Sequence, residues 1–165
     1  MTTTPRIYVT LVNTVLGRVV QGAWIDLDQP LSDVYRDIED ALAGAPGPGL
    51  IAIRDEEGFE PLHLFGHEQL DYVVAVAHGI IVYGEAFACW ARMIGDRRVS
   101  QLEAFTSRYI GSFDTVRGYA KLWLDASGEP DPTEQAIQDC VGVLAEIDTI
   151  VAGPTQIHVF GGWAK

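Results

Sequence analysis

The histidines of this 165-residue chain offer the first chemistry to consider. His63 and His67 are four residues apart, so in a helix both imidazoles would share one face and could hold a zinc ion. Phe65 and Gly66 interrupt that helix, and Leu64 stands where a zinc protease carries its glutamate. We therefore expect no metal site and no other cofactor, with these side chains on a surface or interface.

Three adjacent acids could perform acid–base catalysis. Asp55, Glu56 and Glu57 precede Gly58, and general acid catalysis at neutral pH needs one carboxyl group shielded in an apolar pocket. Three acids in a loop are more often all solvated and ionised. The sequence also has no GxSxG, no phosphate-binding glycine loop and no CxxC. We expect no catalytic residue and a protein that is not an enzyme.

The two cysteines and the start of the chain bear on the compartment. Cys89 and Cys140 are far apart, each within an apolar helical pattern, which is typical of buried thiols in a reducing environment. The first fifteen residues lack the pattern of a signal peptide. No apolar run reaches the 18 residues that a membrane helix needs. We expect a cytoplasmic protein that does not enter a membrane.

Charge is the strongest signal in the composition. The chain has 23 Asp and Glu against 11 Lys and Arg, a net charge of −12. Two segments carry the acids: residues 26–71 have twelve acids against two bases, and residues 125–165 have seven against one. Binding to nucleic acid or to an anionic membrane is disfavoured, because both need basic patches. A solvated acidic surface or a basic partner remains.

One acidic helix is especially informative. At about 100° per residue, Asp33, Asp37 and Asp40 fall on one face of a helix over residues 32–43, opposite its apolar positions. Their axial spacings are about 6 Å and about 4.5 Å. One strand of B-DNA presents a phosphate about every 3.4 Å. The spacing is of the same order, although a merely solvated helix face remains the alternative.

The elements that must position these residues suggest an α+β protein. Residues 6–12, 18–27 and 50–53 have the character of strands. We expect the intervening helix to begin at Ser32 as N-cap and to end at Gly44. Residues 67–110 have helical periodicity in three pieces, separated by Gly79 and Gly95.

The last third adds two helices and a strand. Asp114 is a candidate N-cap for a helix that ends near Leu124. Asp131 as N-cap, with Pro132 and Glu134 behind it, predicts a last helix. Residues 156–160 predict a closing strand. A 48% hydrophobic composition is enough for ordered cores throughout.

Three motifs in register resemble the ArdA antirestriction family. The first motif is a glycine followed by GxW and an acid, the second is I-x-D-x-E-G-F, and the third is an aromatic YxG segment leading into a helix. The terminal HVF, His158 to Phe160, resembles the family's closing strand. The matching residues are Gly17, Arg18, Gly22, Trp24 and Asp26; Ile53, Asp55, Glu57, Gly58 and Phe59; and Phe105, Tyr109, Gly111, Phe113, Asp114, Tyr119 and Ala120.

The resemblance implies a fold and a function. Members of this family are carried by mobile genetic elements, imitate bent DNA and block type I restriction-modification enzymes. It implies an elongated chain of three small domains, an α+β domain at 1–62, a helical domain at 63–104 and an α+β domain at 105–165. It also implies a homodimer joined through the third domain, which the apolar terminal strand and the pair Phe160 and Trp163 would favour. Pairing would extend the imitation, because a charge of −12 matches only about 20 Å of duplex DNA.

The expected interface is made of ionised carboxylates, since Asp and Glu titrate near pH 4. An acidic regulator of another basic DNA-binding protein is the alternative, and a metalloenzyme built on His63 and His67 is a more distant one. Trp24, Gly58, Phe59, Tyr109 and Tyr119 are assigned to structure. The residues expected to imitate DNA are Asp26, Asp28, Asp33, Asp37, Asp40, Asp55, Glu57, Glu60, Glu68 and Asp71 in the first acidic segment and Asp125, Glu129, Asp131, Glu134 and Asp139 in the second.

Overall fold

The computed structural model describes residues 4–13, 18–44, 49–64, 66 and 68–162. The chain is a mixed α+β protein with two small antiparallel sheets, as the sequence predicts. It divides into two compact units, Met1–Leu102 and Glu103–Lys165. Unit 1 contains both the first sheet and the helices that follow it, so the separate domains at 1–62 and 63–104 stay a prediction.

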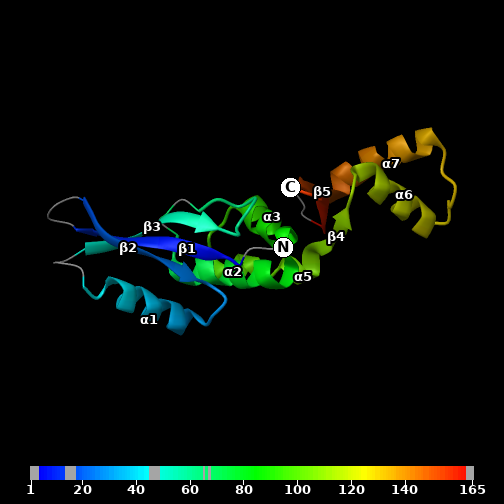
Figure 1. Ribbon diagram of the computed structural model, residues 1–165. Coiled ribbons are helices and arrows are strands. Elements are labelled where there is room, and N and C mark those ends of the chain that lie inside the picture. The colour runs from blue at the N-terminus through cyan, green and yellow to red at the C-terminus, as the bar shows by residue number, and fades with distance from the viewer. Residues whose placement is uncertain (1–3, 14–17, 45–48, 65, 67, 163–165) are drawn as a thin grey trace. The chain divides into compact units, whose positions relative to one another are not determined.

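The sheet of unit 1 has the order β2-β1-β3, and both pairings are antiparallel (Figure 1). Its strands are β1 (Arg6–Asn13), β2 (Arg18–Asp26) and β3 (Gly49–Glu57). Ile7, Val9 and Ile25 are buried, because alternate residues of a strand point to one face. The turn expected between residues 45 and 49 lies largely outside the described residues.

Helix α1 (Leu31–Leu42) packs mainly against β2 and buries Val34 and Ile38. The predicted cap at Ser32 is wrong, because the helix begins one residue before it and Pro30 occupies the N-cap position without a side-chain hydrogen bond. A proline at this point sets the backbone entering the helix and needs no N–H of its own.

Three further helices complete unit 1: α2 (Leu70–Tyr83), α3 (Glu85–Ile94) and the short α4 (Val99–Leu102). The predicted break at Gly79 is wrong, since α2 continues through it. A Cβ at Gly79 would lie 2.2 Å from Cε1 of Phe87, so this glycine lets α3 approach α2 closely. The chain instead breaks at Gly84, whose φ is 64°.

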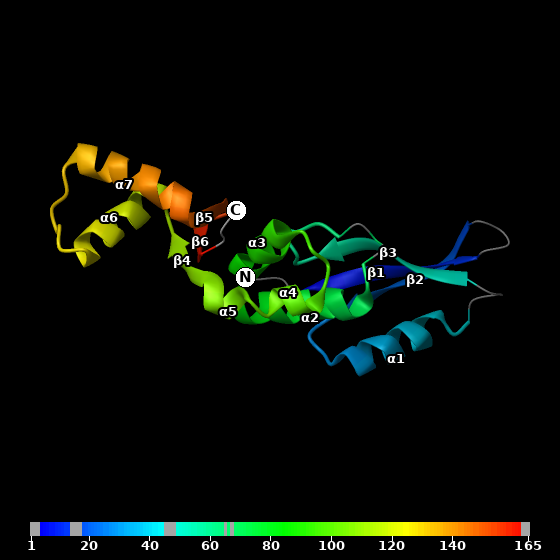
Figure 2. The ribbon, with the colours of Figure 1, turned by 180° about the vertical axis from the view of Figure 1, so that it is seen from behind.

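In unit 2, helices α6 and α7 pack side by side (Figure 2), and they also contact β4 and β5 of the sheet β4-β6-β5. The core between them includes Ala120, Leu144 and Val159, each fully buried. Strand β4 begins at Tyr109, where the sequence pattern predicts helix, and β5 was not anticipated at all. The elements are α5 (Phe105–Arg108), β4 (Tyr109–Phe113), α6 (Val116–Ala126), α7 (Glu134–Ile147), β5 (Asp148–Ala152) and β6 (Ile157–Gly161).

Threonines cap α6 and α7. The Thr115 hydroxyl accepts from Gly118 N at 3.0 Å, and that of Thr133 accepts from Ala136 N at 3.2 Å. The caps predicted at Asp114 and Asp131 are therefore wrong, by one and two residues. A threonine hydroxyl and an aspartate carboxylate can each accept this capping hydrogen bond. The residue types alone therefore do not show which of two nearby residues is the N-cap.

Within the described part of the chain, no helix is both long enough and apolar enough to cross a bilayer.

Candidate functional site

Four carboxylates gather in a hollow between the end of β2 and α1. Asp26 and Asp28 come from the strand end and the following loop, and Asp37 and Asp40 come from the helix. The hollow has a volume of about 370 Å³. Among the described residues, no Lys or Arg lines it. The sequence places Asp37 and Asp40, with Asp33, on one helix face and gives Asp26 and Asp28 only as acids of the same segment. Packing of α1 on β2 brings the four together.

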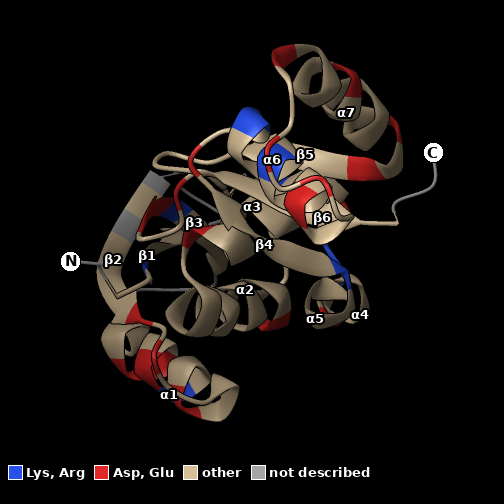
Figure 3. Ribbon diagram, turned by 90° about the vertical axis from the view of Figure 1, so that its right-hand side faces the viewer, with Lys and Arg blue, Asp and Glu red and all other residues tan. Residues whose placement is uncertain are grey.

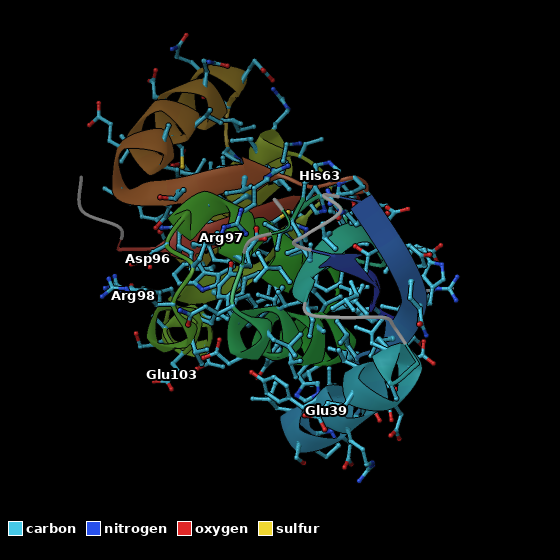
Figure 4. All side chains as sticks on the ribbon, turned by 90° about the vertical axis from the view of Figure 1, so that its left-hand side faces the viewer. Glu39, His63, Asp96, Arg97, Arg98 and Glu103 are labelled. Atoms are coloured by element: carbon cyan, nitrogen blue, oxygen red, sulfur yellow. The ribbon has the colours of Figure 1, made fainter. Side chains whose placement is uncertain are left out.

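The outer face of α1 carries further charge (Figure 3). Asp33 forms an ion pair with Arg36, with 2.9 Å between Oδ1 and Nη2, so part of its negative charge is neutralised. Asp37 accepts instead from the neutral amide of Gln29 at 2.7 Å. Glu39, which the one-faced spacing did not include, is also exposed on this helix (Figure 4).

The end of β3 explains the I-x-D-x-E-G-F motif structurally. Glu57 pairs across the sheet with Arg6, with 2.7 Å between Oε2 and Nη2. Gly58 has a φ of 77°, a conformation that favours glycine, and Phe59 is fully buried. Asp55 is exposed. The assignment of Gly58 and Phe59 to structure agrees with these positions. The charge of Glu57 is partly neutralised by Arg6.

The other acids of the first segment differ in accessibility. Glu60 and Asp71 are exposed. The Glu68 side chain is only 1% exposed and lies 3.9 Å from Nη1 of Arg97. The expectation that Glu68 faces a partner is therefore corrected, because a carboxylate buried beside a guanidinium is not accessible to an external cation.

All five acids expected in the second segment are exposed: Asp125, Glu129, Asp131, Glu134 and Asp139. Glu134 on α7 is paired with Arg117 on α6, and the hydrogen bond from this guanidinium lowers the pKa of the Glu134 carboxyl. Asp139 accepts from Gln135 at 2.8 Å. Arg117 and Lys121 make α6, which precedes and pairs with the second segment, partly basic, so positive charge lies beside these acids (Figure 3).

The described histidines make different contacts. Nδ1 of His63 lies 3.3 Å from Oε1 of Glu56, whereas His67 lies outside the described residues. His78 is exposed and bonds to the backbone of Gln29, and buried His158 bonds to Ser112 Oγ. Among the described residues, no group of three or more His, Cys, Asp and Glu side chains could hold a metal ion.

The remaining motif residues contribute to packing. In the first motif, the Trp24 ring contacts that of Tyr8 in a tilted arrangement with 5.5 Å between ring centroids, and a Cβ at Gly22 would meet the Tyr8 hydroxyl at 2.6 Å. Gly17 lies outside the described residues. In the third motif, the Tyr119 hydroxyl donates to Asp148 Oδ2 at 2.7 Å, joining α6 to β5. Tyr109 stacks on Phe105 with centroids 4.9 Å apart.

These observations define a small acidic α+β protein whose grouped, water-exposed carboxylates suit contact with a cationic partner. The family model described as antirestriction protein (ArdA) matches residues 7–146, which is most of the chain. The chain belongs to the ArdA family, whose membership implies an antirestriction function and binding of restriction-modification enzymes. A search of curated proteins found no match.

Proposed function

We propose that this protein is a DNA mimic that occupies the DNA-binding groove of a type I restriction-modification enzyme and blocks it without catalysing a reaction. The observation that carries the proposal is the hollow lined by Asp26, Asp28, Asp37 and Asp40. This hollow brings together four carboxylates from the end of β2, the following loop and α1. In the part of the chain that the structure describes, no Lys or Arg lines it. Cationic residues that ordinarily contact phosphates would meet these carboxylates.

The acidic surface set is narrower than the sequence suggests. Glu68 is excluded by burial, and Glu57, Asp33 and Glu134 already have cationic partners within the chain. An exposed ion pair is weak, so those three can still contribute when a partner competes for them. The strongest contributors are the acids without such a described ion pair: Asp26, Asp28, Asp37, Asp40, Asp55, Glu60, Asp71, Asp125, Glu129, Asp131 and Asp139.

The test replaces Asp33, Asp37 and Asp40 together by Asn, which keeps shape but removes three charges. Affinity for a purified type I enzyme should fall by at least about tenfold, since three charge-assisted contacts of the interface are weakened. The remaining affinity should depend less steeply on salt, because fewer ionic contacts are left to screen. The melting temperature should move little, because solvated like charges do not stabilise the helix.

The matched control removes three other carboxylates, with D96N, E103Q and E146Q combined. These residues lie outside the proposed set, so affinity should fall much less despite the same change in net charge. Equal losses in the two triple variants would show that only total charge matters. Phage plating on a restricting host should follow the same order, and wild-type protein that binds no type I enzyme would favour a different basic DNA-binding target.

A further inference from the structure

Gln29 holds an unusual place beside the acidic hollow. Its side-chain Nε2 donates to Asp37 Oδ2 at 2.7 Å and to the backbone oxygen of Asp26 at 3.0 Å. Its own backbone oxygen lies 2.9 Å from Nε2 of His78, on α2. A carbonyl oxygen only accepts, so His78 Nε2 carries the hydrogen in this contact. One glutamine thus connects β2, α1 and α2.

The neutrality of this donor matters for the charge of the surface. Asp37 shares the hollow with Asp26, Asp28 and Asp40, and like charges at such a site repel one another. A primary amide can hold a carboxylate in one orientation without adding a positive charge. The contrast is Asp33 on the same helix, which is held by the guanidinium of Arg36.

A second glutamine holds the C-terminal turn of α1. The side-chain amide of Gln21 on β2 donates to the backbone oxygen of Ala41, in the last turn of the helix. Because neutral donors hold α1 at its middle and in its last turn, its acidic face keeps its charge while its position on the sheet is fixed. Of the two, only Gln29 contacts a carboxylate of the hollow.

We propose that Gln29 is a positioning residue for the acidic surface: its amide fixes the Asp37 carboxylate, and its backbone contact with His78 fixes the loop that carries Asp28. The inference rests on the proposed function, since it concerns how that surface is prepared for a cationic partner. A carboxylate that is already ordered loses less side-chain freedom on binding, so affinity gains from the preorganisation.

The decisive variant is Gln29→Glu, because two explanations predict opposite signs. If charge alone attracts the partner, an added carboxylate should tighten binding to a purified type I enzyme. If Gln29 positions Asp37, the variant loses the donor and adds repulsion, so binding should weaken by about threefold to tenfold, the range for one side chain that must be ordered. Gln138→Glu on exposed α7 is the matched control, and it should leave affinity unchanged or slightly raise it.

A measurement without any target separates this inference from the proposed function. In nuclear magnetic resonance spectra, D37N should shift the side-chain amide signals of Gln29, whereas D40N should leave them nearly unmoved. The exchanged pair Q29E with D37N restores one donor and one acceptor at wild-type net charge, so it should recover part of the affinity lost in Q29E.

If D37N leaves the Gln29 side-chain amide signals unshifted, the inference is overturned, whichever enzyme is the target. It is also overturned if the Q29E variant binds the type I enzyme as tightly as the wild-type protein does, or more tightly. If wild-type protein fails to bind the enzyme while D37N still moves the Gln29 signals, the proposed function fails and the positioning of Asp37 stands.

Discussion

Single residues show that a recognisable sequence motif can reflect structural demands of the fold. Gly58 and Phe59 are recognisable in sequence because a left-handed turn and a buried ring each demand one residue type. The acids are different, since any Asp or Glu suits a solvated position. Glu68 could not be separated from Glu60 without the structure, because only packing brings Arg97 beside it.

The cysteines give a prediction at this scale. Burial raises the pKa of the Cys89 thiol to about 11 and also raises that of Cys140. The thiolate is the reactive form, so at pH 8 only about one Cys89 in a thousand is ionised. We expect neither thiol to react with Ellman's reagent in folded protein at pH 8, and both to react within minutes in denaturant. A fast, stoichiometric reaction of native protein would contradict this.

At the scale of elements, the sequence predicts most helices and strands but not how they meet. Periodicity places β1, β2, α1 and β6 to within a few residues, because each has a clear apolar pattern. Strand β5 was missed because residues 148–152 continue the apolar character of α7 without a glycine or proline between them. The pattern around Gly79 predicts a break that does not occur, because a glycine that ends a helix and one that makes room for a neighbouring ring look the same in sequence.

The role of Gly79 predicts the effect of a small substitution. Gly79→Ala should lower the free energy of unfolding by about 1–3 kcal/mol, because the new Cβ meets the Phe87 ring and overpacks the contact between α2 and α3. This loss should exceed the gain of about 1 kcal/mol in helix propensity. Urea denaturation measures the change.

Gly142→Ala on α7 is the matched control, because a Cβ there meets nothing within 4 Å. It should stabilise unit 2 by up to about 1 kcal/mol through helix propensity alone. If both substitutions stabilise the protein, the close approach at Gly79 is not a packing constraint.

At the scale of the molecule, the uneven distribution of charge is more informative than its total. The region 72–124 carries four acids against six bases, whereas residues 26–71 have a net charge of −10. The hollow beside α1 falls in that acidic segment. The sequence thus identifies which part of the chain would meet a basic partner, but folding decides which of its acids share a surface.

Absence of a metal requirement is the next prediction. We expect EDTA to leave the melting temperature and the binding of a type I enzyme unchanged, because the described His, Cys, Asp and Glu side chains form no group suited to a metal. Calorimetry before and after dialysis against EDTA, with metal analysis of the purified protein, measures this. His63→Ala should likewise have little effect. Stoichiometric zinc and a lower melting temperature after chelation would contradict the prediction.

The homodimer is the prediction that the structure most reshapes. Phe160 is fully buried, packed against the rings of Phe105 and Tyr109, so it no longer argues for a dimer, and Trp163 lies outside the described residues. In unit 2, Val143 and Ile147 are 53% and 50% exposed on one face of α7, four residues apart. An exposed apolar pair is suited to a symmetric contact between copies.

Light scattering at micromolar concentration should therefore give about twice the chain mass of 18.0 kDa. Val143→Glu should shift the protein towards monomer, because a two-fold contact would bury the new charge in both copies. Val82→Glu is the matched control, because Val82 is 69% exposed on α2 in unit 1. This substitution should leave the measured mass unchanged. Monomeric wild-type protein would refute the dimer, and a dimer that survives Val143→Glu would move the contact to another face. Since pairing doubles the number of carboxylates that one inhibitor presents, a monomeric Val143→Glu variant should also bind a type I enzyme more weakly than wild type.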